Sequence, residues 1–140
     1  LRLKRTASSV GAVTMFVGTV RDINDDQSVS RLHLEHYPGM TEMAISDILA
    51  EADTRWEIIS ATVIHRIGEL VPSDDIVFVG VSSKHRGDAF DACEFVIDYL
   101  KTKATFWKKE LTKDGDHWLT TRETDFTTAE NWRVGQEALD

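Results

Sequence analysis

The start of the chain predicts two strands separated by a polar loop. The run GAVTMFVGTV within residues 10–20 is apolar, rich in β-branched residues and contains two glycines, which predicts a largely buried strand with close backbone contacts. The stretch RDINDDQS, which begins at Arg21, is rich in Asn and Asp and predicts a mobile loop. Leucines alternate with polar residues in SRLHLEHY, residues 30–37, and this alternation predicts a half-exposed strand.

Two later segments place apolar residues at helical spacing. The first follows Pro38-Gly39 and predicts an amphipathic helix of about 14 residues, whose apolar stripe is closed by Trp56. The second covers residues 88–103 and predicts a long amphipathic helix that packs on a sheet. The apolar positions are Ala44, Ile45, Ile48, Leu49 and Ala52 in the first helix and Ala89, Cys93, Val96, Ile97, Leu100 and Ala104 in the second.

Two more segments, residues 58–67 and 76–82, are rich in β-branched residues and predict strands, the second of them central in its sheet. The order β, β, α, β, β, α and a tail is typical of an α+β domain with helices packed on a mainly antiparallel sheet. We expect one domain over residues 1–140, with flexible ends at residues 1–9 and about 126–140.

The tail from Lys113 onward is rich in Thr, Asp and Glu. Its tryptophans, Trp118 and Trp132, are predicted to be isolated anchors. Thr127 and Glu130 have the spacing of a capping box, which predicts a short last helix.

Composition and charge limit the classes of function. The 140 residues are 41% hydrophobic and 29% charged, as expected for one compact domain. Sixteen Lys+Arg against 24 Asp+Glu give a net charge of −8, which disfavours nucleic-acid binding. No run of about 18 apolar residues is present, so we expect no membrane segment. The single cysteine, Cys93, excludes an intrachain disulfide, and no secretory signal opens the chain, so we expect a cytoplasmic protein.

The first candidate site is the junction SSKHRGDAF, where a strand leads into the second predicted helix. Lys84, His85 and Arg86 lie at the start of that helix, where free N–H groups and the helix dipole favour an anion such as phosphate. The alternative is a solvated loop, because basic residues oppose the dipole at a helix N-terminus.

The second candidate is the lysine-rich segment KTKATFWKKEL. If the helix continued through it, Lys101 and Lys108 would lie on one side, at the edge of the apolar stripe. Partial burial there lowers the pKa of a lysine and favours a nucleophilic or proton-donating amine. The alternative is that each lysine extends from the core edge into solvent.

Three other positions complete the set of candidates. Arg21, at the end of the first strand, is suited to bidentate binding of phosphate, although it also fits an ordinary surface arginine. In the segment HLEH, strand alternation places His33 and Glu35 on one face and turns His36 away, so we expect no metal site. Cys93 lies on the apolar side of its helix, so we expect a core residue rather than a reactive thiolate.

Five segments of the chain, in this order, closely resemble the family of large, catalytic subunits of molybdopterin synthase. They are FVGTVRD, LEHYPGMTE, VIHRIGEL, DDIVFVGVSSKHR and DYLKTKATFWKKE. The resemblance runs from about Gly11 to Asp125 and rests on several long motifs. Thr105 stands where members of the family usually have proline.

The resemblance implies sulfur transfer. In this family, a small ubiquitin-like subunit carries a thiocarboxylate on its C-terminal glycine, and the large subunit moves that sulfur onto cyclic pyranopterin monophosphate. Two transfers form the dithiolene of molybdopterin. The implied fold is an α/β hammerhead, and the implied assembly is a heterotetramer with a central dimer of large subunits. No resident cofactor is expected, since the pterin is the substrate.

The resemblance also assigns residues. Lys101, in the K-T-x-A motif, corresponds to the catalytic lysine, and Lys108, after F-W, to a second essential lysine. The implied substrate-binding residues are Thr19, Val20, Arg21, His85, Arg86, Lys109, Glu110 and Arg122. Arg122, in the motif R-E-x-D, corresponds to an arginine contributed by the neighbouring large subunit.

Together these residues predict a sheltered anion pocket. A phosphate and a thiocarboxylate repel each other in a desolvated site unless fixed cations offset the repulsion, so we expect the basic residues to surround one hollow. Two other functions stay open at this point. One is a non-catalytic module that binds an anion, and the other is a phosphate-ester hydrolase in which Arg21 binds the phosphoryl group.

Overall fold

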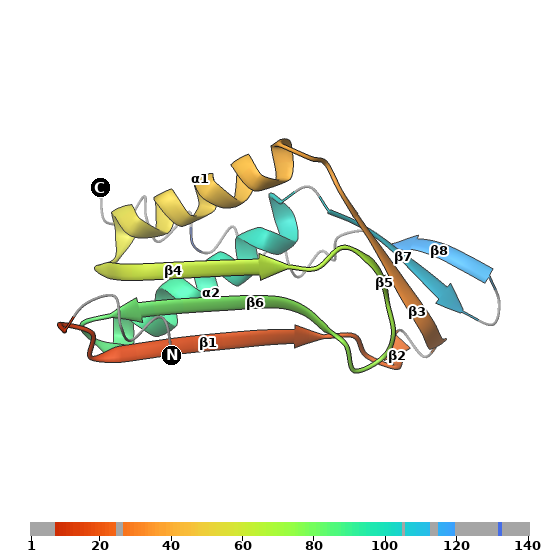
Figure 1. Cartoon of the computed structure of the whole chain (residues 1–140), viewed down its shortest axis with the longest axis horizontal. Helices are drawn as coiled ribbons and strands as arrows, with labels where there is room; N and C mark the ends of the chain where they lie inside the picture. The colour runs from red at the N-terminus through yellow and green to blue at the C-terminus, as the bar shows by residue number, and fades with distance from the viewer. Residues whose placement is uncertain (1–7, 25–26, 105, 113–114, 120–131, 133–140) are drawn as a thin grey trace.

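The structure is a computed structural model of the chain, described here for residues 8–24, 27–104, 106–112, 115–119 and 132. Two helices and antiparallel strands form two sheets, which confirms the predicted α+β class (Figure 1). The predicted capping box at Thr127 and Glu130, the predicted flexible ends and Arg122 lie outside the described residues. Neither helix of the described part is long and apolar enough to cross a membrane.

The first sheet has three strands in the order β1 (Ala12–Thr19), β6 (Asp75–Ser83) and β4 (Ile58–His65), all antiparallel. β6 is central, as its β-branched sequence predicts. The helix α2 (Arg86–Thr102) lies across one face of this sheet, and α1 (Met40–Arg55) lies beside it along the β4 edge (Figure 1). Both helices fall where the apolar periodicity predicts them.

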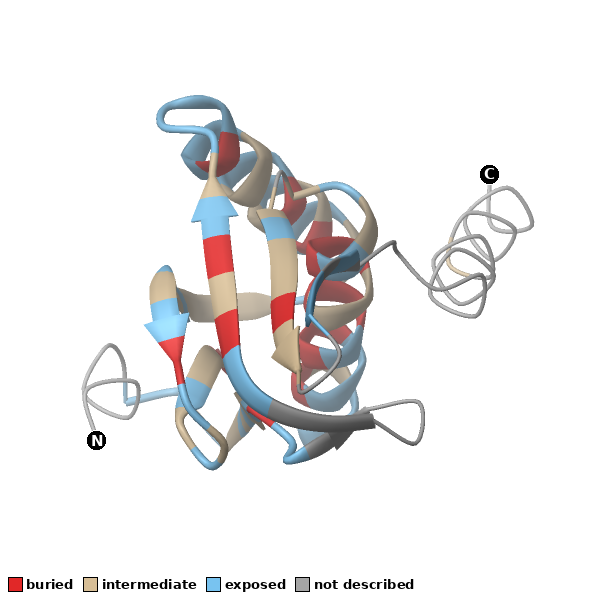
Figure 2. Cartoon of the chain, turned by 90° about the vertical axis from the view of Figure 1, so that its right-hand side faces the viewer, coloured by how far each residue is buried: buried red, intermediate tan, exposed pale blue. Residues whose placement is uncertain are grey.

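The main core lies between α2 and the three-stranded sheet. Part of the core comes from the predicted apolar stripes, but Phe95 and Tyr99 of α2 are buried there although the prediction omits them. Figure 2 shows the buried residues concentrated along α2. Trp56 packs edge-on against Phe95 at a centroid distance of 5.3 Å, which confirms that it closes the apolar stripe of α1. Each large apolar side chain buried in this way contributes about 1.5–3 kcal/mol. The core residues are Ile48, Ala52, Val79, Val81, Ala92, Cys93, Phe95, Val96, Tyr99 and Leu100.

β1 is less buried than the sequence predicts. Phe16 packs on the core, but Met15 and Val17 are each 49% exposed, because α2 covers only one face of the sheet. The expectation of a largely buried strand is therefore wrong for this face. The expected close backbone contacts are confirmed, since a Cβ at Gly11 would collide with the carbonyl oxygen of Lys84 and one at Gly18 would lie 2.9 Å from Val77 Cγ1.

The second sheet contains β3 (Gln27–His36), which pairs with β7 (Phe106–Thr112) and with two short strands, β2 (Ile23–Asn24) and β5 (Gly68–Leu70). β7 also pairs with β8 (Gly115–Leu119). The expected alternation along β3 is confirmed, because Leu32 and Leu34 are buried whereas Glu35 is exposed. A second, smaller core joins Val20, Leu32, Leu34 and Leu70.

One prediction for this sheet is wrong. The polar stretch after Arg21 pairs with β3 through Ile23 and Asn24, so it is not simply a loop. The helix α2 ends at Thr102, close to its predicted end, so Lys101 and Lys108 do not lie on one continuous helix. The chain instead turns into β7, which pairs with β3, and this pairing joins residues far apart in sequence that local periodicity does not report.

Candidate active site

Lys101 lies in the last turn of α2 and its side chain is exposed. A cation is favourable there because the helix dipole presents its negative end. Lys103, which follows the helix, places its Nζ 4.4 Å from the centre of the Tyr99 ring. The two lysines thus have different surroundings: Lys103 covers an aromatic ring, whereas Lys101 lies at the helix end that leads into β7.

Lys108 lies on β7, on the face that turns toward the interior. Its partner across the strands is Leu34, which is only 1% exposed, and directly paired side chains share a face of the sheet. Glu110, two residues further along the same face, is 6% exposed and pairs with Leu32. A lysine and a buried carboxylate therefore lie side by side on this inner face.

Lys109 points to the opposite face of β7. Its Nζ lies 5.5 Å from the centre of the Trp118 ring and 3.8 Å from Asp116 Oδ2, both on the neighbouring strand β8. Strand alternation separates Lys109 from Lys108 and Glu110. Of the three adjacent residues that the sequence singles out here, only Lys108 and Glu110 therefore share a face.

Arg21 follows a residue of the small core. Thr19 ends β1, and the backbone of Val20 is held by hydrogen bonds with Ser73 and Asp74 at 2.9 Å each. Val20 is buried in the same cluster as Leu34, the partner of Lys108 across the strands. Arg21 follows directly and is exposed, so β1 delivers it to the junction of the two sheets.

His65, which the sequence analysis did not select, lies at the same junction. It is the last residue of β4, and its ring stacks on Phe106 with a centroid distance of 3.7 Å and an interplanar angle of 16°. Burial lowers the pKa of His65, and the positive charge of Lys108 lowers it further, against a hydrogen bond to the Arg66 carbonyl. His65 lies in the segment VIHRIGEL, one of those that carry the family resemblance, but nothing in its local sequence marks it as a site residue.

The pair His85 and Arg86 lies at the other end of α2. Both side chains are exposed, and the helix of 17 residues begins at Arg86. At 1.5 Å per residue, the Arg86 and Lys101 backbones are about 22 Å apart. The expectation that all the basic residues surround one hollow is therefore wrong within a single chain, because the stiff helix separates them.

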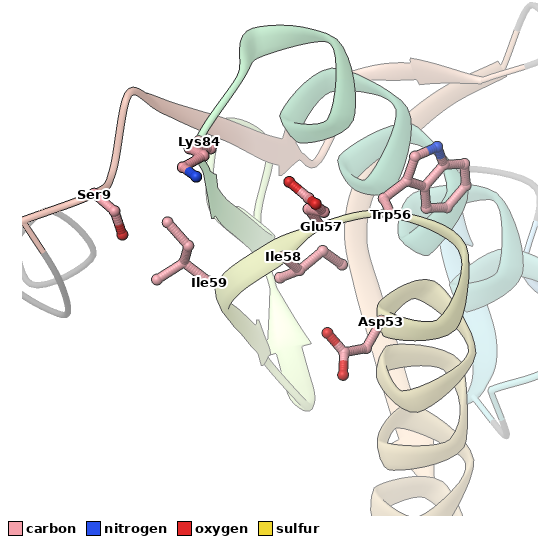
Figure 3. Close-up of a pocket in the computed structure, with 7 residues that line it drawn as sticks. All are labelled: Ser9, Asp53, Trp56, Glu57, Ile58, Ile59 and Lys84. Atoms are coloured by element: carbon pink, nitrogen blue, oxygen red, sulfur yellow. The ribbon is translucent and has the colours of Figure 1, made fainter.

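A pocket of about 460 Å³ opens at this far end, between the end of α1, the start of β4 and the end of β6. Its lining is mixed, as Figure 3 shows: the carboxylates of Asp53 and Glu57 lie with Ile58 and Trp56, whereas Ser9, Ile59 and Lys84 lie at the other side. Two acidic groups against one lysine do not favour an anion. This pocket is separate from Lys101 and Lys108.

The described residues do not favour a metal site or a reactive cysteine. Among them, no group of three or more His, Cys, Asp or Glu side chains is arranged to hold a metal ion. His33 Nε2 lies 3.1 Å from Glu35 Oε1, whereas His36 pairs with Glu42, so the predicted divergence of the two histidines is confirmed. Cys93 is buried in the core, as predicted, and burial raises the pKa of its thiol to about 11.

Comparison with known sequences identifies relatives along most of the chain. The family described as MoaE protein matches residues 2–103. A molybdopterin synthase catalytic subunit from Ralstonia nicotianae is 53% identical over 132 residues, which cover 94% of this chain and 75% of that protein. The protein of the same name from Escherichia coli K12 is 57% identical over 122 residues, covering 87% of this chain and 81% of that protein.

Solved structures share the fold. A MoaE protein from Burkholderia ambifaria superposes with a TM-score of 0.79 at 50% identity and covers 94% of this chain and 86% of that one. A molybdopterin synthase structure from Staphylococcus aureus has a TM-score of 0.78 at 36% identity, covering 81% and 83%. A chain from a complex of subunits 1 and 2 of the molybdopterin-converting factor of Helicobacter pylori has a TM-score of 0.68 at 21% identity, which shows the fold alone.

Proposed function

This chain belongs to the MoaE protein family, and we propose that it catalyses the sulfur-transfer step that makes molybdopterin. The sulfur comes from the C-terminal thiocarboxylate of a small ubiquitin-like subunit and moves to cyclic pyranopterin monophosphate. The observation that carries the proposal is the identity of more than half to proteins named molybdopterin synthase catalytic subunit, over nearly the whole chain. The position of Lys108 on the inner face of β7, opposite the buried Leu34, supports it.

The proposed roles of the basic residues follow from the negative charge of both reactants. Substrate phosphate and thiocarboxylate are both anions, and their approach in a partly desolvated site needs fixed cations nearby. Arg21 binds the phosphate, with Thr19 and Val20 supplying the backbone around it. Lys101 acts directly on the pterin or acyl intermediate, as a proton donor or through a transient covalent adduct, and Lys108 stabilises the negative charge that develops.

Lys109 and Glu110 have separate parts in this proposal. The buried Glu110 lies on the same face as Lys108 and offsets its charge in the interior. Lys109 lies on the outer face beside Trp118, where it contacts the substrate or the small subunit from the other side of the strand. The two roles are compatible with the positions of Lys109 and Glu110 on opposite faces of β7.

The partners follow from the same geometry. His85 and Arg86 lie too far along α2 to reach Lys101 of their own chain, so they join such a site only from a second copy. We therefore propose a central dimer of this chain with one small subunit at each end, and Arg122 as a further residue given to the neighbouring copy. The name of the relatives, molybdopterin synthase catalytic subunit, supports a second, different subunit as the partner.

Two further expectations belong to the proposal. The reaction needs no resident cofactor or metal, because the sulfur arrives on a protein and the pterin is the substrate. A cytoplasmic location suits the lone thiol of Cys93, which is buried rather than paired in a disulfide.

Substitution of the two lysines tests the function. The chain is mixed with the thiocarboxylated small subunit and the pterin precursor, and dithiolene product is measured by mass spectrometry. We expect Lys101→Ala and Lys108→Ala each to lower turnover at least about 100-fold, the size of a lost acid–base or charge-stabilising group. Lys103→Ala is the matched control, because Lys103 lies two residues from Lys101 but covers Tyr99.

The outcomes separate the competing functions. Near-wild-type turnover by Lys101→Ala contradicts the assigned role and favours a non-catalytic anion-binding module. Release of inorganic phosphate without sulfur gain by the pterin favours a hydrolase instead. Loss of activity in Lys103→Ala as well indicates a general effect of removing positive charge.

A further inference from the structure

His65 has a well-defined position at the junction of the two sheets, where β4 ends and leads toward β5 (Figure 1). Its imidazole lies nearly parallel to the Phe106 ring, at 3.7 Å between centroids. Phe106 is the first residue of β7, and it pairs with His36 on β3. Through this stacking, His65 at the end of the first sheet contacts β7, the strand that carries Lys108.

The protonation state of His65 follows from its hydrogen bond. The Nδ1 atom lies 2.8 Å from the carbonyl oxygen of Arg66, and a carbonyl oxygen only accepts, so Nδ1 carries the hydrogen. In the neutral ring, the proton is then absent from Nε2, which presents a lone pair. Burial and the charge of Lys108 both lower the pKa of His65, so the neutral form predominates at neutral pH.

Lys108 lies within reach of this ring. Phe106 and Lys108 are two residues apart on β7, so their side chains leave the same face about 7 Å from each other. The imidazole that stacks on Phe106 therefore lies on the same side of β7 as Lys108, and the charge of Lys108 acts on it. The four-carbon stem of lysine is flexible, so a fixed acceptor narrows the positions that its amine adopts.

The other charged groups around His65 have contacts of their own. The Nε2 atom of His36 lies 3.7 Å from Glu42 Oε1 at the start of α1. The guanidinium of Arg66 donates to the backbone carbonyl of Asp75 at 3.2 Å. On β6, the partner of His65 is Val77, which carries no charge. Lys108 is thus the ammonium group that β7 places next to the imidazole.

Resting on the proposed sulfur transfer, we propose that His65 is a positioning residue for Lys108: its Nε2 atom accepts a hydrogen bond from the Lys108 ammonium and holds it in the active orientation. The neutral ring accepts without adding charge. Protonation at acidic pH removes the acceptor and places two positive charges together, so the amine is displaced and activity falls. His65 itself touches no substrate.

Titration of the imidazole tests the contact without any substrate. The pKa of His65 is measured by NMR in the unaltered chain and in Lys108→Met. We expect the His65 pKa to lie below its ordinary value of 6.5 and to rise when Lys108 is replaced. A His65 pKa that does not respond to Lys108→Met overturns the proposal.

Kinetics test the positioning role. His65→Phe keeps a ring to stack on Phe106 but has no acceptor, whereas His65→Gln supplies an acceptor that does not titrate. We expect His65→Phe to lower kcat about tenfold with little change in KM, as for the loss of one hydrogen bond to a charged group. His65→Gln is expected to keep most of kcat at neutral pH and to lose the acidic fall in activity.

A purely structural role predicts a different result. In that case His65→Phe has normal kcat and the same pH profile, and the proposal is wrong. His33→Gln, on the outer face of β3 beside Glu35, is the control and should leave kcat and its pH profile unchanged. If the unaltered chain transfers no sulfur, the proposed function fails, and the titration alone then decides whether His65 and Lys108 interact.

Discussion

Trp132 is the clearest test of how a residue beyond β8 is held against the two helices. Its indole packs edge-on against Trp56 at 5.4 Å and against Phe95 at 5.8 Å. Its Nε1–H donates to Asp98 Oδ2 at 2.7 Å, and its backbone carbonyl accepts from Arg55 Nη1 at 2.9 Å. The prediction of an anchor is confirmed, although Trp132 is joined to both helices rather than isolated.

The loss of unfolding free energy expected on removal of the Trp132 side chain follows from these contacts. Removal of a fully buried tryptophan side chain costs about 3–5 kcal/mol, and Trp132 is only partly buried. Two aromatic pairs at about 0.5–1.5 kcal/mol each and one charge-assisted hydrogen bond give a similar figure. We expect Trp132→Ala to lower the free energy of unfolding by about 3 kcal/mol, and Trp132→Phe by about 1 kcal/mol, because the ring contacts remain.

Urea unfolding followed by circular dichroism measures both effects. Trp118→Ala is the matched control, since Trp118 is 56% exposed and should cost less than about 1 kcal/mol. The reasoning is refuted if Trp132→Ala shifts the midpoint no more than Trp118→Ala does. A change in the urea m-value would instead indicate that the segment detaches before the domain unfolds.

Two further predictions concern a buried thiol and a glycine close to the backbone of a neighbouring segment. The thiol of Cys93 should not react with iodoacetamide at pH 8 until the chain is unfolded, because burial raises its pKa to about 11; rapid labelling of the folded chain would contradict this. Gly11→Ala should lower the free energy of unfolding by about 2 kcal/mol, because the added Cβ collides with the Lys84 carbonyl, whereas Gly87→Ala has open space and should be neutral or stabilising. Thermal unfolding of the two variants compares them directly.

The long elements and their buried faces were predictable from the sequence. Ile48 and Ala52 of α1, Val96 and Leu100 of α2 and the alternating leucines of β3 all face the core, as predicted. Helix and strand periodicities are properties of the local backbone, so an apolar stripe identifies the buried face without knowledge of what covers it. Cys93 was assigned to the core for the same reason.

Only the tertiary structure determined which side chains from different elements are neighbours. Lys108 points inward because β7 pairs with β3, and that pairing joins segments separated by about seventy residues. His65 reaches Phe106 only because β4 ends where the second sheet begins. The length of α2 separates Arg86 from Lys101, although both ends of the helix carry plausible anion ligands. Sequence spacing determines the face of an element, whereas the partners on that face depend on contacts between distant segments, which no local pattern encodes.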